Sequence, residues 1–197
     1  MEKEQAEKSV SEDTKEGSLT LKELTLENHR KAERRAFAKK LLSGKIDPKE
    51  YYKYLTNQYY NYVILEVTLI AKGFPHRLWN VFRRQAIKED LQELEETYGF
   101  TFAHDILTRS TTEYPSHVES LDYEGLLAHM YVRHFGDMYG GSIIKGRIPG
   151  SGRMYDFEDK ENLKTSLRSI LNNDMADEAN KCFEFATRLF EELEDAE

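Results

Sequence analysis

The sequence predicts an all-α protein, a single-domain multi-helix bundle of roughly six to eight helices. Apolar residues recur every three to four positions along most of the chain, which is the helical period. Segments with two-residue alternation bounded by hairpin turns are missing, and no repeat of roughly 20 to 50 residues is visible. A length of 197 residues with 39% hydrophobic content suits one domain around one core.

Composition narrows the class of protein. The net charge of −8 argues against general nucleic-acid binding. No run approaches the roughly 20 apolar residues that a membrane span needs, and the polar N-terminus lacks the apolar core of a signal peptide. Cys182 is the single cysteine, so an internal disulfide is excluded. These features predict a cytoplasmic protein without a membrane anchor.

The chain divides into a tail and a domain. Residues 1–18 are charged and nearly free of large apolar groups, so we expect them to be disordered. The helical domain is expected over residues 19–197. Its first helix is predicted from Leu19 to Leu42, and Gly44 can end it in the left-handed conformation.

The next helix has a strong start signal. Asp47 is the expected N-cap, Pro48 the first helical residue and Glu50 the partner that completes a capping box. Its apolar pattern continues to about Lys72. Further helices are expected over residues 79–98, where Gly99 ends the helix, and over residues 101–107, 123–145, 158–171 and 175–193. Tyr114-Pro115 is expected to lie in a loop.

Three glycines interrupt the predicted helix over residues 123–145. Gly136, Gly140 and Gly141 each lower helix stability by about 1 kcal/mol relative to alanine. Gly136 and Gly140 are about 40° apart around the helix axis, so they share a face. That face suits either close helix packing or the approach of a flat ligand, and the spacing alone leaves both interpretations open.

Polar residues surround the glycine face. Arg133 and His129 lie within roughly 60° of it and Asp137 flanks it at about 100°. His129 is a rival candidate metal ligand, but at about 10 Å from Gly136 along the axis it cannot address the same centre.

The first predicted helix offers a second candidate site. His29 and Glu33 are four residues apart, so the carboxylate can hold one ring nitrogen while the other faces a metal. Lys22 lies about 10 Å back along the axis, where it can reach the acid groups of a large flat ligand. Lys164 and Arg168 add a second pair of cations. The alternative for all of these is an ordinary solvated helix face.

The sequence lacks the residues that other common metal and nucleotide sites need. A ferritin-like di-iron site needs Glu-x-x-His pairs, and no histidine here has an acidic residue three positions before it. A single cysteine argues against a structural zinc site, and "GDMYGG" is not a nucleotide-binding glycine loop.

Together, the segments resemble the heme oxygenase family. "LTLENHRKAE" resembles the family's proximal segment and "LLAHMYVRHFGDMYGGSIIKG" its distal helix. "KTSLR" and "FEFATRLFEELE" match later parts of the family pattern. The resemblance covers about Leu19 to Glu194 and implies a heme sandwiched between a proximal and a distal helix.

The resemblance implies a role for each matched residue. His29 would be the iron ligand and Glu33 its supporting partner. Asp137 would anchor the distal water network. The other matches are Lys22, Tyr131, Lys164 and Arg168 on the propionate side, Gly136, Gly140 and Gly141 on the distal face, and Arg133 and Tyr62 around Asp137.

The implied activity is oxygen-dependent cleavage of heme b, both substrate and cofactor, to biliverdin IXα, carbon monoxide and ferrous iron. The bacterial and plastid type implies ferredoxin or a similar electron donor and a downstream bilin reductase as partners. Basic residues in the first helix could form a docking surface or merely a solubilising face: Arg30, Lys31, Arg34, Arg35, Lys39 and Lys40. The alternatives are a non-catalytic heme or bilin carrier and, more weakly, a different enzyme on the same fold.

Some residues depart from the family pattern. Tyr139 stands where a small residue is usual, His134 replaces a common tyrosine, and Ala186 replaces an asparagine. The loop after Arg168 is also short. These departures bear on the water network and on which meso carbon is attacked.

Overall fold

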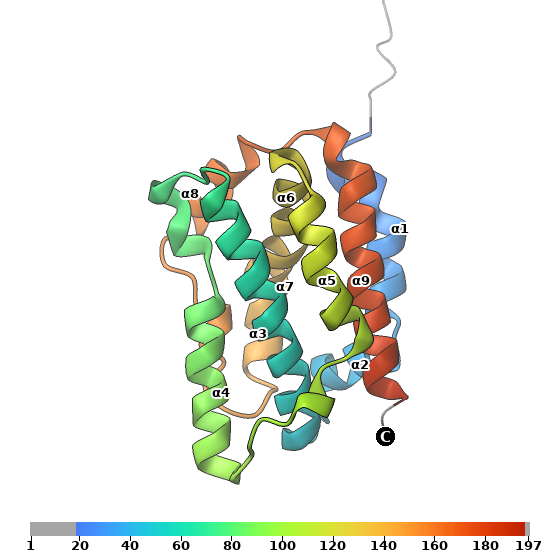
Figure 1. The fold of residues 1–197 in the computed structure, drawn as a ribbon, viewed down its shortest axis with the longest axis vertical. Helices are drawn as coiled ribbons and strands as arrows, with labels where there is room; N and C mark the ends of the chain where they lie inside the picture. Colours follow the sequence, from blue (N-terminus) through green and yellow to red (C-terminus); the bar gives the residue numbers. More distant parts are fainter. Residues whose placement is uncertain (1–18, 196–197) are drawn as a thin grey trace, which may run out of the picture.

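The computed structural model describes residues 19–195, so the predicted tail over residues 1–18 lies outside the described residues. Within them the chain forms helices and loops and no strand, which confirms the predicted all-α class (Figure 1). The α-helices are α1 (Leu21–Glu33), α2 (Ala36–Ser43), α3 (Pro48–Ala71), α4 (Arg84–Tyr98), α5 (Arg109–Ser120), α6 (Tyr123–Met130), α7 (Gly136–Lys145), α8 (Lys160–Arg168) and α9 (Ala176–Glu194).

Shorter segments connect them. Four are 3₁₀ turns: η1 (His76–Val81), η2 (His104–Ile106), η4 (Arg153–Tyr155) and η5 (Asn173–Met175). The fifth, η3 (Tyr131–Phe135), is a π-helix that joins α6 to α7.

The bundle is organised around α3 and α9. The long helix α3 packs against α4, α5 and α6, while α9 packs against α1, α5 and α6. As a result α4 and α1 lie at opposite sides of the molecule (Figure 1). The core has two clusters, one centred on apolar residues of α6, η3 and α9 and the other on residues of α3 and α4.

Local signals fixed several helix ends as predicted. Asp47 caps α3, Pro48 is its first residue, and Glu50 closes the capping box. Gly44 and Gly99 end α2 and α4 in the left-handed conformation, with φ of 71° at both. These signals lie within a few residues of the ends that they determine, which is why the sequence shows them.

The predicted first helix from Leu19 to Leu42 is two helices, because α1 ends at Glu33 and α2 starts at Ala36. Glu194 of α9 explains the break. Its carboxylate accepts the Phe37 backbone N–H at 2.9 Å and pairs with the Arg35 guanidinium at 2.6 Å. A carboxylate at a helix start satisfies unpaired N–H groups and favours the helix dipole.

The predicted helix over residues 79–98 is interrupted in the same way. Phe82 is extended, and α4 starts only at Arg84. Glu66 of α3, which is fully buried, accepts the Arg83 backbone N–H at 2.6 Å and the Arg84 N–H at 3.3 Å.

The prediction of a loop at Tyr114-Pro115 is wrong, since Pro115 lies inside α5. Proline removes one helical hydrogen bond, but Tyr114 and Val118 on either side are fully buried and tie the helix to its neighbours α3 and α9. The helix expected over residues 101–107 is only the turn η2.

Among residues 19–195, no helix combines the length and the apolar character that crossing a bilayer requires.

Candidate active site

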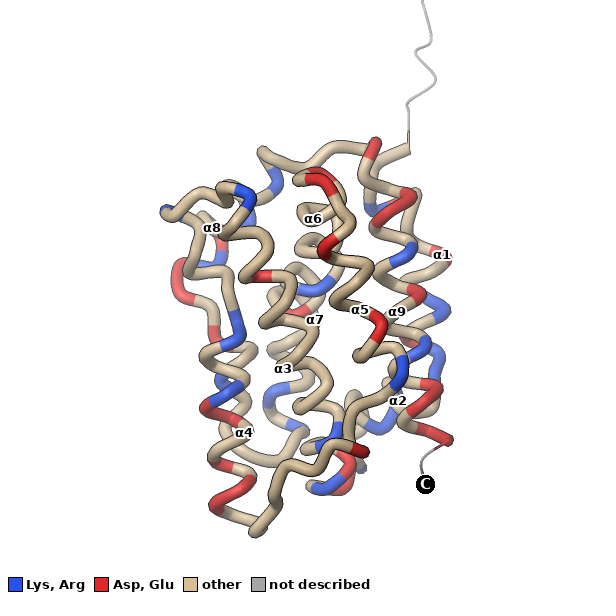
Figure 2. Tube along the Cα trace, viewed as in Figure 1, with Lys and Arg blue, Asp and Glu red and all other residues tan. Residues whose placement is uncertain are grey.

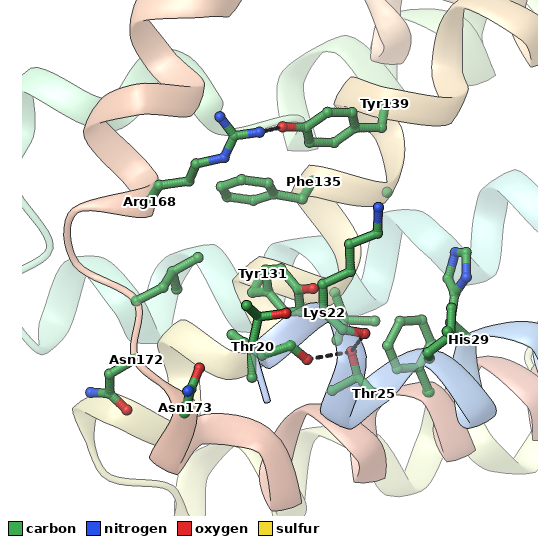
Figure 3. A pocket seen from close by; sticks show the side chains of 16 residues that line it. Thr20, Lys22, Thr25, His29, Tyr131, Phe135, Tyr139, Arg168, Asn172 and Asn173 are labelled. Carbon is green, nitrogen blue, oxygen red and sulfur yellow. Dashed lines mark hydrogen bonds between the residues drawn. The ribbon is translucent and has the colours of Figure 1, made fainter. Parts of the chain in front are cut away.

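A cavity of about 700 Å³ separates α1 from the segment that runs through η3 into α7. Figure 3 shows Lys22 and His29 on the α1 side, with Phe135 and Tyr139 opposite and Arg168 at a third edge. The lining is mainly apolar and includes Leu21, Leu26, Val132, Leu171 and Phe183. The volume falls within the roughly 300–1,000 Å³ of pockets that enclose small molecules.

His29 presents its imidazole to this cavity from the exposed face of α1. Its ring packs edge-on against Phe183 of α9 with ring centroids 5.4 Å apart. Glu33 lies one turn further along, with its Oε1 3.5 Å from His29 Nε2. The carboxylate is therefore beside the ring, as the spacing predicted, at ion-pair distance.

Lys22 lines the same cavity two turns before His29. It is exposed and makes no ion pair with any described residue. Tyr131 enters from the opposite side, with its ring 5.5 Å from Phe135. The structure thus brings Lys22, His29 and Tyr131 to one cavity.

The helix opposite His29 changes its winding at the cavity. Residues Tyr131–Phe135 form a π turn, and α7 starts at Gly136. Such turns are rare and concentrate at functional sites. The sequence predicted one helix over residues 123–145 with three glycines in it, and the structure instead has a π turn directly before the first of these glycines.

The three glycines of α7 have different environments. A Cβ built on Gly136 or Gly140 would meet no atom within 4 Å, and Gly136 lines the cavity. A Cβ on Gly141 would lie 2.6 Å from Cδ1 of Tyr155. Gly136 and Gly140 thus leave the backbone face open, whereas Gly141 is required for packing against η4 and does not share that face, contrary to its predicted role.

Asp137 lies part-buried beside the open glycine face. The Tyr62 hydroxyl, from α3, donates a hydrogen bond to its Oδ2. Burial raises the pKa of Asp137 to about 7, although the Tyr62 hydrogen bond and the nearby Arg83 and Arg133 charges act to lower it. A carboxyl that titrates near neutral pH can both hold and release a proton.

Arg133 is buried behind Asp137 and is held by groups that the sequence did not single out. Its Nε donates to the Tyr114 hydroxyl at 3.0 Å, and one terminal nitrogen donates to Gln58 Oε1 at 3.1 Å. The guanidinium carbon also lies 4.4 Å from the centre of the Tyr114 ring. Tyr114 and Gln58 come from α5 and α3, so only the fold reveals this network.

Tyr139 contacts both predicted propionate-binding cations. Arg168 donates a hydrogen bond to its hydroxyl, and Lys164 Nζ lies 4.3 Å from its ring centre. Its ring stacks on Phe135 at 6.1 Å. Arg168 and Tyr139 line the cavity, whereas Lys164 is buried behind the Tyr139 ring and pairs with Glu161 at 2.9 Å.

His134, the other departure in this helix, points away from the cavity. Its Nε2 is 3.0 Å from Glu66 Oε1, and both side chains are fully buried. The His134 imidazole therefore contacts the same Glu66 carboxylate that accepts the backbone N–H groups of Arg83 and Arg84 at the start of α4. Ala186 lies part-buried in α9.

The fold and the cavity define an all-helical protein with a histidine facing a bare helix backbone across an apolar slot. The family model for heme oxygenase matches residues 16–192. A heme oxygenase from Porphyra purpurea is 31% identical over 88% of this chain and 84% of its own length.

Solved structures agree with this likeness. Heme oxygenase-1 from Synechocystis sp. PCC6803, solved in complex with heme, aligns with a TM-score of 0.75 at 26% identity, over 89% of this chain and 91% of that one. Heme oxygenase from Leptospira interrogans aligns with a TM-score of 0.73 at 28% identity, over 86% and 96%. The chain belongs to the heme oxygenase family, which confirms the resemblance found in its sequence.

Proposed function

We propose that this protein is a heme oxygenase that binds heme b in the cavity between α1 and α7. It would cleave heme with molecular oxygen at a meso carbon to biliverdin, carbon monoxide and ferrous iron. One observation carries the proposal: the His29 imidazole and the open backbone at Gly136 line the same apolar cavity.

The residues present fit a heme. A flat macrocycle needs an apolar slot, and the lining here is mainly apolar. An iron ligand is available at His29, and no side chain at Gly136 fills the opposite face. Lys22 and Arg168 at the cavity can bind carboxylate groups, as the propionates of heme require.

When bound, heme supplies both the iron that activates oxygen and the meso carbon that is oxidised. His29 would offer a neutral imidazole nitrogen to the iron, and the Glu33 carboxylate would orient the ring. On the other side, Asp137 would hold or release a proton at its carboxylate near neutral pH. Tyr62 would fix the position of that carboxylate through its hydrogen bond, and the nearby Arg133 charge would act to lower its pKa.

Cations at the cavity edge would set the rotation of heme in its plane. Lys22 extends from α1, and Arg168 extends from α8 with its guanidinium held by the Tyr139 hydroxyl. Holding the propionates at these cations would determine which meso carbon is oxidised. We infer attack at the α-meso position, so that the product is biliverdin IXα, which a bilin reductase could then consume.

The electron donor would be ferredoxin or a similarly acidic protein. Four exposed residues of α1, α2 and their junction, Arg30, Lys31, Arg34 and Lys39, make no ion pair with described residues, and we call them the proximal basic surface. Arg35 and Lys40 instead pair with Glu194 and Glu50. Positive segments recur along α1 and toward α2 in Figure 2. Complementary charge would steer an acidic donor to the His29 side.

Reconstitution with hemin tests the proposal. The full chain is loaded with hemin, then supplied with a ferredoxin system and oxygen while the absorption spectrum is followed. Catalysis predicts loss of the Soret band, growth of a bilin band and release of carbon monoxide. A stable heme spectrum through repeated reduction in oxygen would instead establish a heme carrier and refute the enzyme.

A further inference from the structure

Outside the heme cavity, three metal-ligating side chains meet between α5, α6 and α9. They are His117, His129 and Glu178, and none of them lines the cavity. His117 Nε2 lies 2.5 Å and His129 Nε2 lies 3.0 Å from the same oxygen, Oε1 of Glu178. One donor atom from each residue lies within 4.8 Å of the other two. From this convergence we propose a binding site for a first-row divalent transition metal, independent of the heme site.

The donor set suits such an ion. Two imidazole nitrogens with one carboxylate oxygen bind zinc, cobalt or ferrous iron, whereas magnesium and calcium prefer oxygen ligands alone. A tetrahedral ion with ligands at about 2.0–2.1 Å spaces its donor atoms roughly 3.3 Å apart. The observed 2.5 Å and 3.0 Å separations need to widen by less than about 1 Å to admit it, and the imidazole donors, within 4.8 Å of each other, need to adopt the same spacing.

The groups around the cluster hold its donors in place. The Tyr114 hydroxyl is 2.7 Å from Nδ1 of His129, so Nε2 is the nitrogen directed at Glu178. Lys181 donates to the other carboxylate oxygen of Glu178 at 2.8 Å and leaves Oε1 for the ion. Hydrogen bonds of this kind, which orient the ligands from behind, are typical of metal sites.

An ion can reach the cluster from the surface. His117 and Glu178 are 24% and 16% exposed, whereas His129 is fully buried. On binding, the metal would displace the protons that the imidazoles share with Glu178. It would also link α5 and α9 to α6, the helix that leads into the π turn of the heme cavity.

Titration of the hemin-free full chain with cobalt(II) tests the site, because cobalt bound by nitrogen ligands absorbs in the visible region. We expect one equivalent of cobalt to bind and added zinc to displace it. His117→Gln removes a part-exposed donor, and Glu178→Gln removes the shared oxygen while keeping the side-chain shape. Loss of a residue that only orients a metal ligand weakens binding by about tenfold or more. Loss of a ligand itself should therefore weaken cobalt binding by more than about tenfold in each variant.

Two controls locate the ion. His104→Gln changes an exposed histidine outside the cluster and should bind as the unsubstituted protein does. His29→Ala should also bind normally, since His29 belongs to the heme cavity. The proposal is overturned by the absence of a visible band, by equal binding in His117→Gln and His104→Gln, or by loss of binding in His29→Ala. Far-UV circular dichroism confirms folding, and His117→Gln decides the matter if Glu178→Gln does not fold.

Discussion

Gly136 and Gly141 lie in the same helix, α7, but a methyl group would be accommodated at only one of them. At Gly136 it would meet no atom within 4 Å, whereas at Gly141 it would lie 2.6 Å from Tyr155 Cδ1. Gly136 therefore leaves space at the cavity, whereas Gly141 allows close packing against Tyr155 in the core.

This difference predicts opposite effects of two alanine substitutions. Gly141→Ala should lower the free energy of unfolding by about 1–3 kcal/mol, because the new methyl overpacks against Tyr155. Gly136→Ala should raise it by up to about 1 kcal/mol, because alanine is the better helix former, but should weaken hemin binding. Urea unfolding of the hemin-free protein and hemin titration measure the two effects. Equal loss of stability in both variants would contradict the assignment.

Asp137 predicts a stability change with pH. Its pKa is about 7 in the folded protein, against an ordinary value of 3.8. Between these values the folded state binds the proton more tightly, so this carboxyl lowers stability as pH rises from about 4 to 7. Relative to Asp137→Asn, the native protein should lose no more than about 4 kcal/mol over that window. A difference between the two proteins that does not vary with pH would show that the carboxyl is not perturbed.

We expect Tyr139 to keep the Arg168 guanidinium in position to bind a heme propionate. Because Arg168 donates a hydrogen bond to its hydroxyl, Tyr139→Phe should weaken hemin affinity by about fivefold, which corresponds to about 1 kcal/mol. The ring is kept in this variant, so its contact with Lys164 remains. Measured in an Arg168→Ala background, the same change should have almost no effect. An equal effect in both backgrounds would mean that Tyr139 acts on hemin directly.

The proximal basic surface should govern electron delivery. Reversing charge at Arg34 and Lys39 together should slow reduction by ferredoxin by about tenfold at low ionic strength, and added salt should reduce the difference. Lys88→Glu, with half that change in net charge, is a control for position, since Lys88 is exposed on α4, at the opposite side of the bundle (Figure 1). Dithionite should reduce all variants alike. A similar decrease in the Lys88 variant would indicate a general charge effect in place of a docking surface.

Much of the fold was predictable because its signals are local. The capping box at Asp47 and the left-handed glycines at Gly44 and Gly99 were read directly from neighbouring residues. The two missed helix breaks depend on carboxylates distant in the chain, Glu194 and Glu66, whose positions no local pattern reveals. The loop predicted at Tyr114-Pro115 is wrong for a related reason, since burial of the neighbours of Pro115 outweighs the lost helical hydrogen bond.

In the candidate site, too, contacts within one helix were predictable from the sequence and contacts between helices were not. His29 and Glu33 share a helix, so their spacing predicted the contact between them. Gly136 and Gly141 looked alike in sequence, and only the position of Tyr155 separates them. Tyr114 was missed as a support for Arg133 because it comes from another helix, and the expected loop at that point gave it no role.

The proposed function depends most on His29 as the ligand through which this cavity binds heme. The absorption spectra of the hemin complexes of the native protein and His29→Ala, in the ferric and ferrous states, test this role. We expect the alanine variant to lose the histidine-ligated spectrum and added imidazole to restore it, while His117→Gln leaves the spectrum unchanged. A histidine-ligated spectrum that persists in His29→Ala would show that another residue binds the iron.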